Sequence, residues 1–255
     1  MDAAIELINI RKTYGKQVAV RQFSLTVGQG EFVTMIGSSG CGKTTVLKMI
    51  NGLILPDSGR VLINGRDIAG GDLIALRRNI GYAIQGSVLF PHMTVEKNIA
   101  YVPSLLNKHD RRKTSQAVRK WLKLVGLDES LLQRYPGELS GGQQQRVGIA
   151  RALAASPEIL LMDEPFGAVD GITRGQLQAE IARIHRQTGI TVVFVTHDIS
   201  EAVRLGTKML VMNEGAIVQY DQPDTILRQP ANEFVRLLAA SGRKPAGHDA
   251  DAAAL

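Results

Sequence analysis

The chain has 255 residues, 44% of them hydrophobic, and a formal net charge of +6. A chain of this length can bury a full core, so we expect one large globular domain or a core with an inserted subdomain. The single cysteine excludes an intramolecular disulfide, and no apolar run approaches the about 18 residues that a membrane-spanning helix needs. The chain start does not resemble a signal peptide, so we expect a protein of the reducing cytosol. The scattered positive charge does not predict nucleic acid as a partner.

The first third of the chain is expected to be rich in strands. Residues 5–14 and 19–37 carry many β-branched side chains and are interrupted by Gly28 and Gly30, which is typical of strands joined by turns. A helix is expected after the glycine-rich run at 37–42, closing near Gly52. Residues 58–68 then predict a β-hairpin, because Asn64-Gly65 is a strong signal for a two-residue turn.

The middle of the chain has helical character. Val118, Trp121, Leu122 and Val125 recur at the spacing of one helix face. We therefore expect an inserted helical subdomain at about residues 86–157. Trp121 is expected to anchor its core rather than to stack on a ligand.

Beyond this region the pattern changes to buried strands. The runs "EILLMDEP" at 158–165 and "TVVFVTHD" at 191–198 are short and apolar, as in strands covered on both faces of a parallel sheet. Leu177, Ile181 and Ile184 form a helical stripe between them, so the order predicts a βαβ crossover and an α/β fold. Residues 241–255 lack periodicity and are expected to form a disordered C-terminal tail.

The stretch "GSSGCGKT" at 37–44 follows a predicted strand and opens a predicted helix. Glycines in this context let backbone N–H groups point at phosphate oxygens, so the pattern predicts a site for ATP; an incidental glycine-rich turn is the alternative. Lys43 is expected to contact the β- and γ-phosphates and the Thr44 hydroxyl to ligate Mg²⁺. Cys41 is expected to contribute its backbone, with a reactive thiol as the alternative. The predicted nucleotide contacts in this run are Gly37, Ser38, Ser39, Gly40, Cys41, Gly42, Lys43, Thr44 and Thr45.

Two acidic residues end the first of the buried runs. Asp163 is expected at the carboxyl end of its strand, where open α/β sheets bind ligands, and its carboxylate can hold Mg²⁺. Glu164 is expected to orient the attacking water or accept its proton. His197, expected to end the neighbouring strand, can donate to the γ-phosphate. A simple turn and a structural histidine are the alternatives.

The stretch "LSGGQQQR" at 139–146 begins a second predicted helix, with Ser140 as its N-cap. Its two glycines predict another anion-binding helix start. One nucleotide cannot easily reach both helix starts in one chain if the helical subdomain projects from the sheet. We therefore predict a two-fold homodimer in which Ser140, Gly141, Gly142 and Gln143 of one chain cover the nucleotide of the other.

With these motifs the chain resembles the ATP-binding subunits of ABC transporters over about residues 5–237. The resemblance implies a P-loop NTPase (RecA-like) core at about 1–85 and 158–225, with an antiparallel β subdomain and the inserted helical subdomain at about 86–157. Together they form an ATP-binding domain at 1–240. It also implies that Tyr14 stacks on adenine and that Gln85 contacts Mg²⁺ and the attacking water. Leu139–Gln143 matches the signature motif, and Asp170 the loop that joins the two sites of a dimer.

The resemblance further implies membrane permease subunits as partners and a place at the cytoplasmic face of the cell membrane. An apolar cluster of Val88, Leu89, Phe90, Pro91 and Met93 is expected to line the groove that receives the permease; core packing is the alternative. Residues 89–106 and 135–170 resemble importers of quaternary amines such as glycine betaine and choline, which also use an extracytoplasmic solute-binding protein. Gly171 and residues 86–88 depart from that group's pattern.

Other functions remain open at this point. Import of another small solute, such as a sulfonate, phosphonate or amino acid, is the main alternative, and export is a weaker one. A soluble ABC ATPase of DNA repair or ribosomes is less expected, because the chain neither duplicates the cassette nor inserts a coiled coil. A non-catalytic ATP sensor is disfavoured because Lys43, Asp163, Glu164 and His197 are all present.

Overall fold

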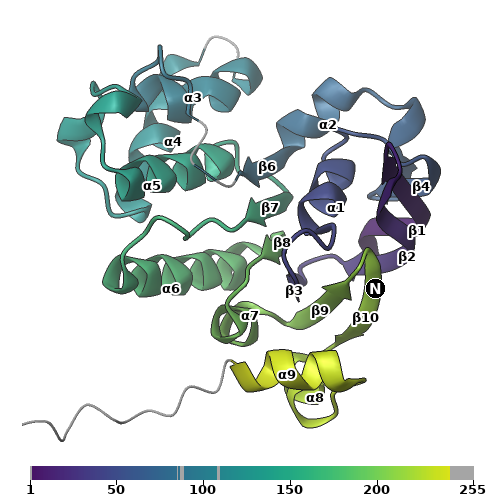
Figure 1. Cartoon of the computed structure of the whole chain (residues 1–255). Coiled ribbons are helices and arrows are strands. Elements are labelled where there is room, and N and C mark those ends of the chain that lie inside the picture. Colours follow the sequence, from purple (N-terminus) through teal and green to yellow (C-terminus); the bar gives the residue numbers. More distant parts are fainter. Residues whose placement is uncertain (1, 85, 87–88, 108–109, 242–255) are drawn as a thin grey trace, which may run out of the picture.

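The computed structural model describes residues 2–84, 86, 89–107 and 110–241. Its centre is a six-stranded sheet in which β9, β3, β8, β7 and β6 run parallel and β10 pairs antiparallel with β9 (Figure 1). The buried central strands are rich in Val, Ile, Leu and Met, as expected where both faces of a sheet are covered. In spatial order the strands are β10 (Ala216–Asp221), β9 (Lys208–Asn213), β3 (Phe32–Gly37), β8 (Thr191–Val195), β7 (Ile159–Asp163) and β6 (Ile80–Ala83).

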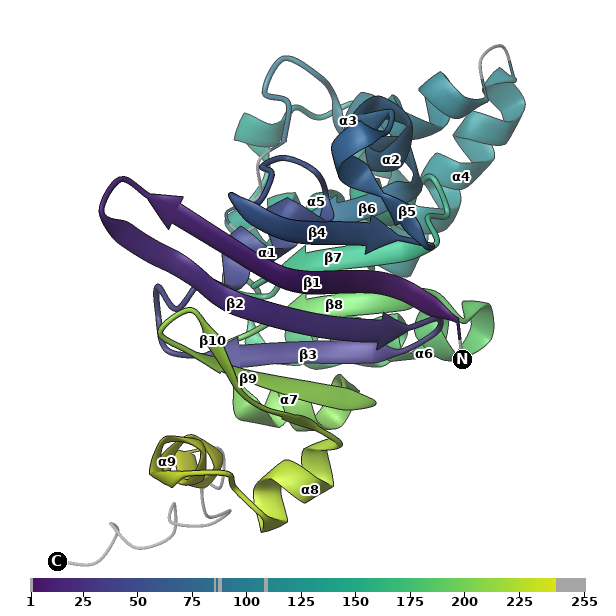
Figure 2. The same cartoon turned by 90° about the vertical axis from the view of Figure 1, so that its right-hand side faces the viewer.

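A four-stranded antiparallel sheet packs across one face of this centre, with helix α1 (Lys43–Ile50) between the two sheets (Figure 2). Its strand order is β2, β1, β4, β5. The β4–β5 hairpin turns at Asn64 and Gly65, whose positive φ angles of 49° and 73° suit a two-residue turn, so this prediction is confirmed. The strands are β1 (Ala3–Tyr14), β2 (Gln17–Gly28), β4 (Ser58–Ile63) and β5 (Arg66–Asp67).

The helical part, by which we mean α3, α4 and α5, forms a separate lobe beside β6 and β7 (Figure 1). Trp121 is buried with Val118, Leu122 and Val125 in the core of this lobe, so its predicted role as a core residue is confirmed. Short 3₁₀ turns at Glu129–Leu131 and Pro136–Glu138 lead into α5. The helices are α3 (Val95–Leu106), α4 (Arg111–Leu124) and α5 (Gly141–Leu153).

The remaining helices cover the other edge and face of the central sheet. α6 (Gly171–Thr188) connects β7 to β8 and buries Leu177, Ile181 and Ile184, which confirms the predicted βαβ crossover. α7 (Ile199–Leu205) packs on β3, and α8 (Pro223–Arg228) and α9 (Glu233–Ser241) close the end of the chain. The rest of the predicted tail lies outside the described residues. No helix in the described ranges has the length and apolar character to cross a membrane.

The predicted fold class, α/β with an antiparallel sheet and helical parts, is confirmed. The sequence analysis did not predict β6 or the short helix α2 (Leu73–Asn79) that precedes it. Both lie on a segment without a strong helical or strand period. No residue of α2 is buried, and only Leu73 and Leu76 pack partly buried against the core.

Candidate functional site

The glycine-rich loop lies between β3 and α1, as predicted. Gly40 and Gly42 have φ angles of 75° and 103°, which side chains other than glycine rarely adopt. A Cβ on Gly37 would lie 2.1 Å from the Met212 carbonyl oxygen, and one on Gly42 would lie 2.4 Å from that of Ala19. The loop therefore needs glycine for two reasons, its backbone conformation and the close approach of neighbouring backbone.

Lys43, the first residue of α1, folds back over this loop. Its ammonium donates to the carbonyl oxygens of Gly37 at 2.9 Å and Ser38 at 2.8 Å, and lies 3.6 Å from the Cys41 thiol. Gly42 caps the helix without a side-chain acceptor, so no side chain occupies the N–H groups at its start. A positive charge and uncapped helix N–H groups thus face the same loop, which suits an anion.

The turn between β9 and β10 supports the loop from behind. The Ser38 hydroxyl donates to Asn213 at 2.9 Å, and the Gly215 N–H donates to the Cys41 carbonyl at 3.1 Å. The Cys41 side chain is buried. A cavity of about 420 Å³ lies between this turn and the glycine-rich loop, and Lys16 and Arg21 are among the residues that line it. The sequence analysis did not single out these two basic residues.

A cavity of about 370 Å³ opens beside the loop. The predicted site residues that line it are Tyr14, Ser39, Gly40, Gly42, Lys43, Thr44, Thr45 and Glu164. Tyr14 is half exposed, with 49% of its surface accessible, so its ring is free to contact a bound group. Of the described residues that line this cavity, none belongs to the stretch 139–143.

Asp57 holds the end of β1 next to Tyr14. Its carboxylate accepts hydrogen bonds from the Thr13 N–H at 2.7 Å and the Thr13 hydroxyl at 2.6 Å, and it pairs with Lys12 at 2.7 Å. These partners lower the pKa of Asp57 to about 2, with the hydrogen bond from Lys12 as the largest cause. Sequence reasoning missed this residue, because its partners lie far away along the chain.

Asp163 is the last residue of β7 and pairs in register with Val195 of β8. Its side chain is buried, and burial raises the pKa of its carboxyl above the ordinary value, although a hydrogen bond with Thr44 opposes this rise. Its Oδ2 atom has no hydrogen-bond partner in the structure. A buried carboxylate oxygen without a partner, beside a threonine hydroxyl, has the hard oxygen chemistry that Mg²⁺ prefers, so these residues fit that ion.

Glu164 follows Asp163 at the turn that leaves β7. Its φ of 44° lies in the left-handed region, and its N–H donates to the Val195 carbonyl at 3.0 Å. The Glu164 carboxylate lies 3.5 Å from His197 Nδ1, and the histidine side chain is 71% exposed. His197 lies two residues beyond the end of β8, so the prediction that it ends the strand is wrong by a short turn. Gln85 lies outside the described residues.

The signature stretch begins α5, with Ser140 as its N-cap. The Ser140 hydroxyl accepts from the Gln143 N–H at 3.3 Å, and the Gln143 side chain accepts from the Ser140 N–H at 2.9 Å. This reciprocal capping box confirms the predicted helix start. Asp170 caps α6 by accepting from the Thr173 N–H at 3.0 Å, and its pKa is lowered by that backbone hydrogen bond.

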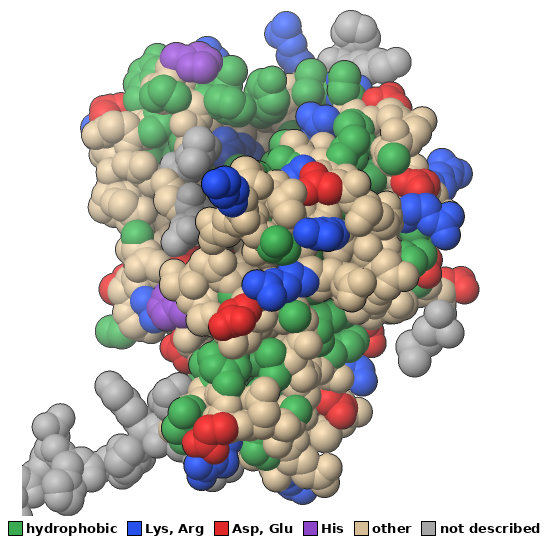
Figure 3. Space-filling model, turned by 45° about the vertical axis from the view of Figure 1, so that its right-hand side comes forward, with side chains coloured by type: hydrophobic (Ala, Val, Ile, Leu, Met, Phe, Trp, Pro, Cys, Tyr) green, Lys and Arg blue, Asp and Glu red, His purple; other side chains and the backbone are tan. Residues whose placement is uncertain are grey.

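Apolar side chains are exposed on the helical part near Phe90. The Phe90 and Tyr101 rings lie 4.9 Å apart, and the Arg151 guanidinium lies 5.3 Å from the Phe90 ring centre. Leu105 and Leu106 are each more than 40% exposed, whereas Leu89 is buried. Figure 3 shows hydrophobic side chains gathered across the top of the molecule, over the helical part. Val88, also predicted for this cluster, lies outside the described residues.

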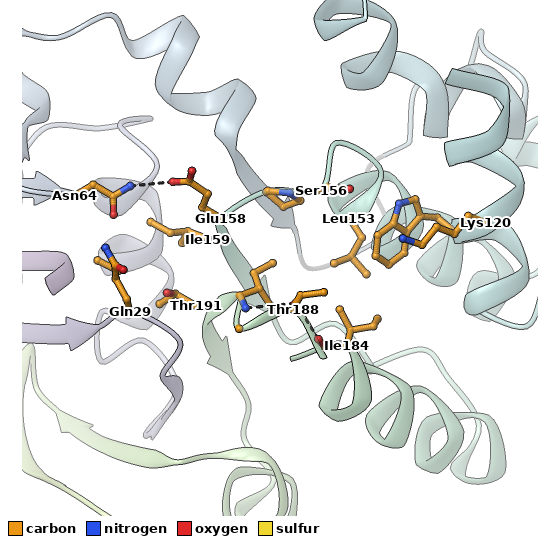
Figure 4. A pocket seen from close by; sticks show the side chains of 15 residues that line it. Gln29, Asn64, Lys120, Leu153, Ser156, Glu158, Ile159, Ile184, Thr188 and Thr191 are labelled. Carbon is orange, nitrogen blue, oxygen red and sulfur yellow. Dashed lines mark hydrogen bonds between the residues drawn. The ribbon is translucent and has the colours of Figure 1, made fainter. Parts of the chain in front are cut away.

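A larger cavity, of about 440 Å³, lies at the opposite end of the central strands (Figure 4). It is bounded by Ile159 and Thr191, the first residues of β7 and β8, and by Trp121. Two of the polar side chains here make hydrogen bonds: Asn64 donates to Glu158 at 3.0 Å and Thr188 to the Ile184 carbonyl at 2.8 Å. We assign it no function, because the loop, the acids and the histidine all lie at the other end of the sheet.

Comparison with known proteins shows the family of the chain. A sequence model of the family described as "ABC transporter" matches residues 20–167. The carnitine transport ATP-binding protein OpuCA of Listeria monocytogenes is 52% identical over 228 residues, which are 89% of this chain and 57% of that protein. The glycine betaine uptake system ATP-binding protein YehX of Escherichia coli is 51% identical over 232 residues, which are 91% of this chain and 75% of that protein.

Solved structures of ABC cassettes also match this chain. A dimeric structure of a bacterial ABC transporter cassette matches with a TM-score of 0.81 and 35% sequence identity, covering 86% of this chain and 98% of that one. A dimeric ATP-binding cassette in a post-hydrolysis state, with ADP and Pi bound, matches with a TM-score of 0.80 and 34% identity.

Proposed function

This chain belongs to the ABC transporter family, and we infer that it binds and hydrolyses ATP and so drives a membrane permease that imports a small solute. The observation that carries this inference is the convergence of three features at the carboxyl ends of the central strands. The phosphate loop with Lys43, the buried Asp163 beside Thr44, and the Glu164–His197 pair all adjoin the cavity beside α1 or its rim.

The residues of this site divide the chemistry among them. The loop N–H groups and Lys43 bind the phosphates of ATP, while Tyr14 stacks on adenine. Asp163 and Thr44 would hold Mg²⁺, with Gln85 as a further ligand implied by the resemblance. When bound there, Mg²⁺ would supply positive charge that offsets the charge of the phosphates. Glu164 orients the attacking water and accepts its proton. His197, which lies beside the Glu164 carboxylate, donates to the γ-phosphate.

ATP also joins two copies of the chain in this proposal. The start of α5 carries Ser140, Gly141, Gly142 and Gln143, none of which lines the cavity of its own chain. A two-fold dimer places these residues of one chain against the nucleotide of the other. Similarity to dimeric cassettes supports this arrangement. Closing of the dimer after ATP binding then moves the permease subunits, and hydrolysis reopens it.

The exposed apolar surface near Phe90 is the proposed docking site for the permease. It lies on the helical part, which carries the signature stretch, so closing of the dimer moves both together. The permease holds the chain at the cytoplasmic face of the cell membrane. Recognition of the solute is left to the permease and an extracytoplasmic binding protein.

The proposed solute is an osmoprotectant quaternary amine, such as glycine betaine or choline. The names of similar proteins, which include carnitine and glycine betaine transport, support this class. A sulfate/thiosulfate import ATP-binding protein of Pseudomonas putida is 43% identical over 235 residues, so another small solute is the competing candidate.

Uptake in cells tests both parts of the proposal. Radiolabelled glycine betaine and choline are supplied to cells that lack this chain, carry it, or carry Glu164→Gln. Uptake only with the unaltered chain is the expected result. Uptake that is equal in all three strains, with expression verified and no second carrier, rejects the quaternary-amine assignment. ATP hydrolysis by the purified chain tests the catalytic part separately.

A further inference from the structure

The three consecutive glutamines of α5 make three different contacts. Gln143 completes the capping box with Ser140, and Gln144 donates to the Leu139 carbonyl at 3.2 Å. Both contacts are local, within the start of the helix. Gln145 is buried, with 5% of its surface exposed, and its side chain forms hydrogen bonds with residues outside the helical part. Its contacts are with the segment that follows the catalytic glutamate.

Gln145 uses both ends of its side-chain amide on this segment. Its Oε1 atom accepts from the Ala168 N–H at 2.9 Å, and its Nε2 atom donates to the Glu164 carbonyl at 3.4 Å. One side chain thus bridges residues 164 and 168, within the segment that connects β7 to α6. The bridge fixes the carbonyl of the residue whose carboxylate faces His197.

The backbone packing around this bridge is equally close. A Cβ on Gly142 would lie 3.2 Å from the Ala168 carbonyl oxygen, so the start of α5 rests directly on the same segment. Glu164 itself has a φ of 44°, a conformation that its surroundings must maintain. Helix α5 also packs against α3 and α4, so the bridge connects the whole helical part to this strained residue.

We propose that Gln145 is a positioning residue. Its hydrogen bond connects the backbone of Glu164 to α5, so that movement of α5 moves the catalytic carboxylate of the same chain. This inference rests on the proposed function of Glu164 in ATP hydrolysis. Engagement of Ser140 by the partner's nucleotide would shift α5, which also carries Gln145. The amide hydrogen bonds of Gln145 would pass that shift to Glu164 and Ala168. Gln145 touches neither nucleotide nor water in this scheme.

The test compares two variants with a neighbouring control. Gln145→Met keeps the size of the side chain and removes both hydrogen bonds, whereas Gln145→Glu keeps the acceptor for Ala168 and removes the donor to Glu164. Gln144→Met removes a local contact of the same helix and serves as the control. ATP turnover, normalised to the number of ATP-binding sites, and the exchange rate of the Ala168 N–H with deuterium are measured for each.

We expect kcat to fall at least about tenfold in Gln145→Met, with KM for ATP within about twofold, because a misplaced catalytic group lowers turnover rather than ground-state binding. Ala168 N–H exchange should accelerate in Gln145→Met and not in Gln144→Met. A merely structural role would reduce the amount of competent protein without changing normalised kcat. A normalised kcat within about twofold of the unaltered chain overturns the proposal.

Two further measurements keep the result interpretable. If Gln145→Met does not fold, Gln145→Glu decides, and a normal kcat in that variant rejects the donor contact with Glu164. Unaltered chain and Glu164→Gln are assayed alongside. Absence of turnover in the unaltered chain, or turnover in Glu164→Gln, would contradict the proposed function itself. The Ala168 exchange rate reports the bridge in either case.

Discussion

Helices α1 and α5 both start beside glycines, and these two helix starts differ in almost every physical respect. At α1, Gly40 and Gly42 have positive φ angles and no side chain caps the helix. At α5, Gly141 and Gly142 are helical residues, and Ser140 and Gln143 cap each other. The start of α1 leaves its backbone N–H groups available to an external anion. At the start of α5, some of the backbone N–H groups already donate to side chains of the same helix start.

The glycines themselves serve different purposes at the two starts. In the phosphate loop, glycine is required by the backbone conformation and by the nearness of Ala19 and Met212. In the signature stretch, Gly142 allows close packing on Ala168, and Gly141 has only ordinary contact with that residue. The same residue type therefore marks a preformed binding loop in one region and an inter-element contact in the other.

The largest effect is expected for Glu164→Gln, which leaves both helix starts intact. Removing the proton acceptor should lower turnover by about 100-fold or more, while ATP binding persists. If the two starts act together on one nucleotide, ATP should then trap a stable dimer. Phosphate release and size-exclusion chromatography with ATP measure the two parts. Normal hydrolysis would remove Glu164 from its proposed role.

Ser140→Arg should separate the two starts. A large side chain at the start of α5 should weaken ATP-driven dimerisation by about 30-fold or more, because it would clash with the phosphates of the partner's nucleotide. The ATP affinity of the monomer should stay within about twofold. Nucleotide titration and sedimentation in a Glu164→Gln background measure these values. Dimerisation at the unaltered level would contradict the assignment of the α5 start to the interface.

A matched pair of glycine substitutions tests the backbone difference directly. Gly42→Ala should lower the free energy of unfolding by about 2 kcal/mol, because φ is 103° and the new Cβ would lie 2.4 Å from the Ala19 carbonyl oxygen. Gly141→Ala should raise it by about 0.5 kcal/mol through reduced freedom of the unfolded chain. Urea unfolding without nucleotide measures both. Equal effects would erase the distinction drawn here.

The smallest effect concerns the acid beside the α1 start. Burial raises the pKa of Asp163, so the native state holds its proton to higher pH than the unfolded chain does. The free energy of unfolding therefore falls as pH rises above about 4, and the loss persists at neutral pH. Asp163→Asn should raise the melting temperature of the nucleotide-free chain by roughly 2 °C at pH 7.

Thermal melts from pH 4 to pH 8 provide the measurement. The difference between Asp163→Asn and the unaltered chain should shrink toward the acid end, where both forms are neutral. A lower melting temperature for the variant at pH 7 would show that the carboxylate is compensated in the native state.

Much of the fold was readable from local patterns. The Asn64-Gly65 hairpin, the Ser140 helix start and the βαβ crossover each depend on short-range backbone chemistry, and each is confirmed. α2 and β6 were missed because their segment lacks a clear hydrophobic period. The exact end of β8 was also missed, since Thr196 is β-branched, as strand residues often are, but lies beyond the end of the strand in the structure.

The glycine-bearing starts of α1 and α5 and the acids at the end of β7 can be inferred from the sequence alone, because conformational freedom, capping and charge are properties of short stretches of chain. Which groups come into contact is a property of the tertiary fold. Asp57 reaches Thr13 across 44 positions, and Gln145 reaches Ala168 across 23. Those contacts follow from the order of the strands and from the packing of α5 on the segment after Glu164. Neither feature is encoded by a local sequence pattern.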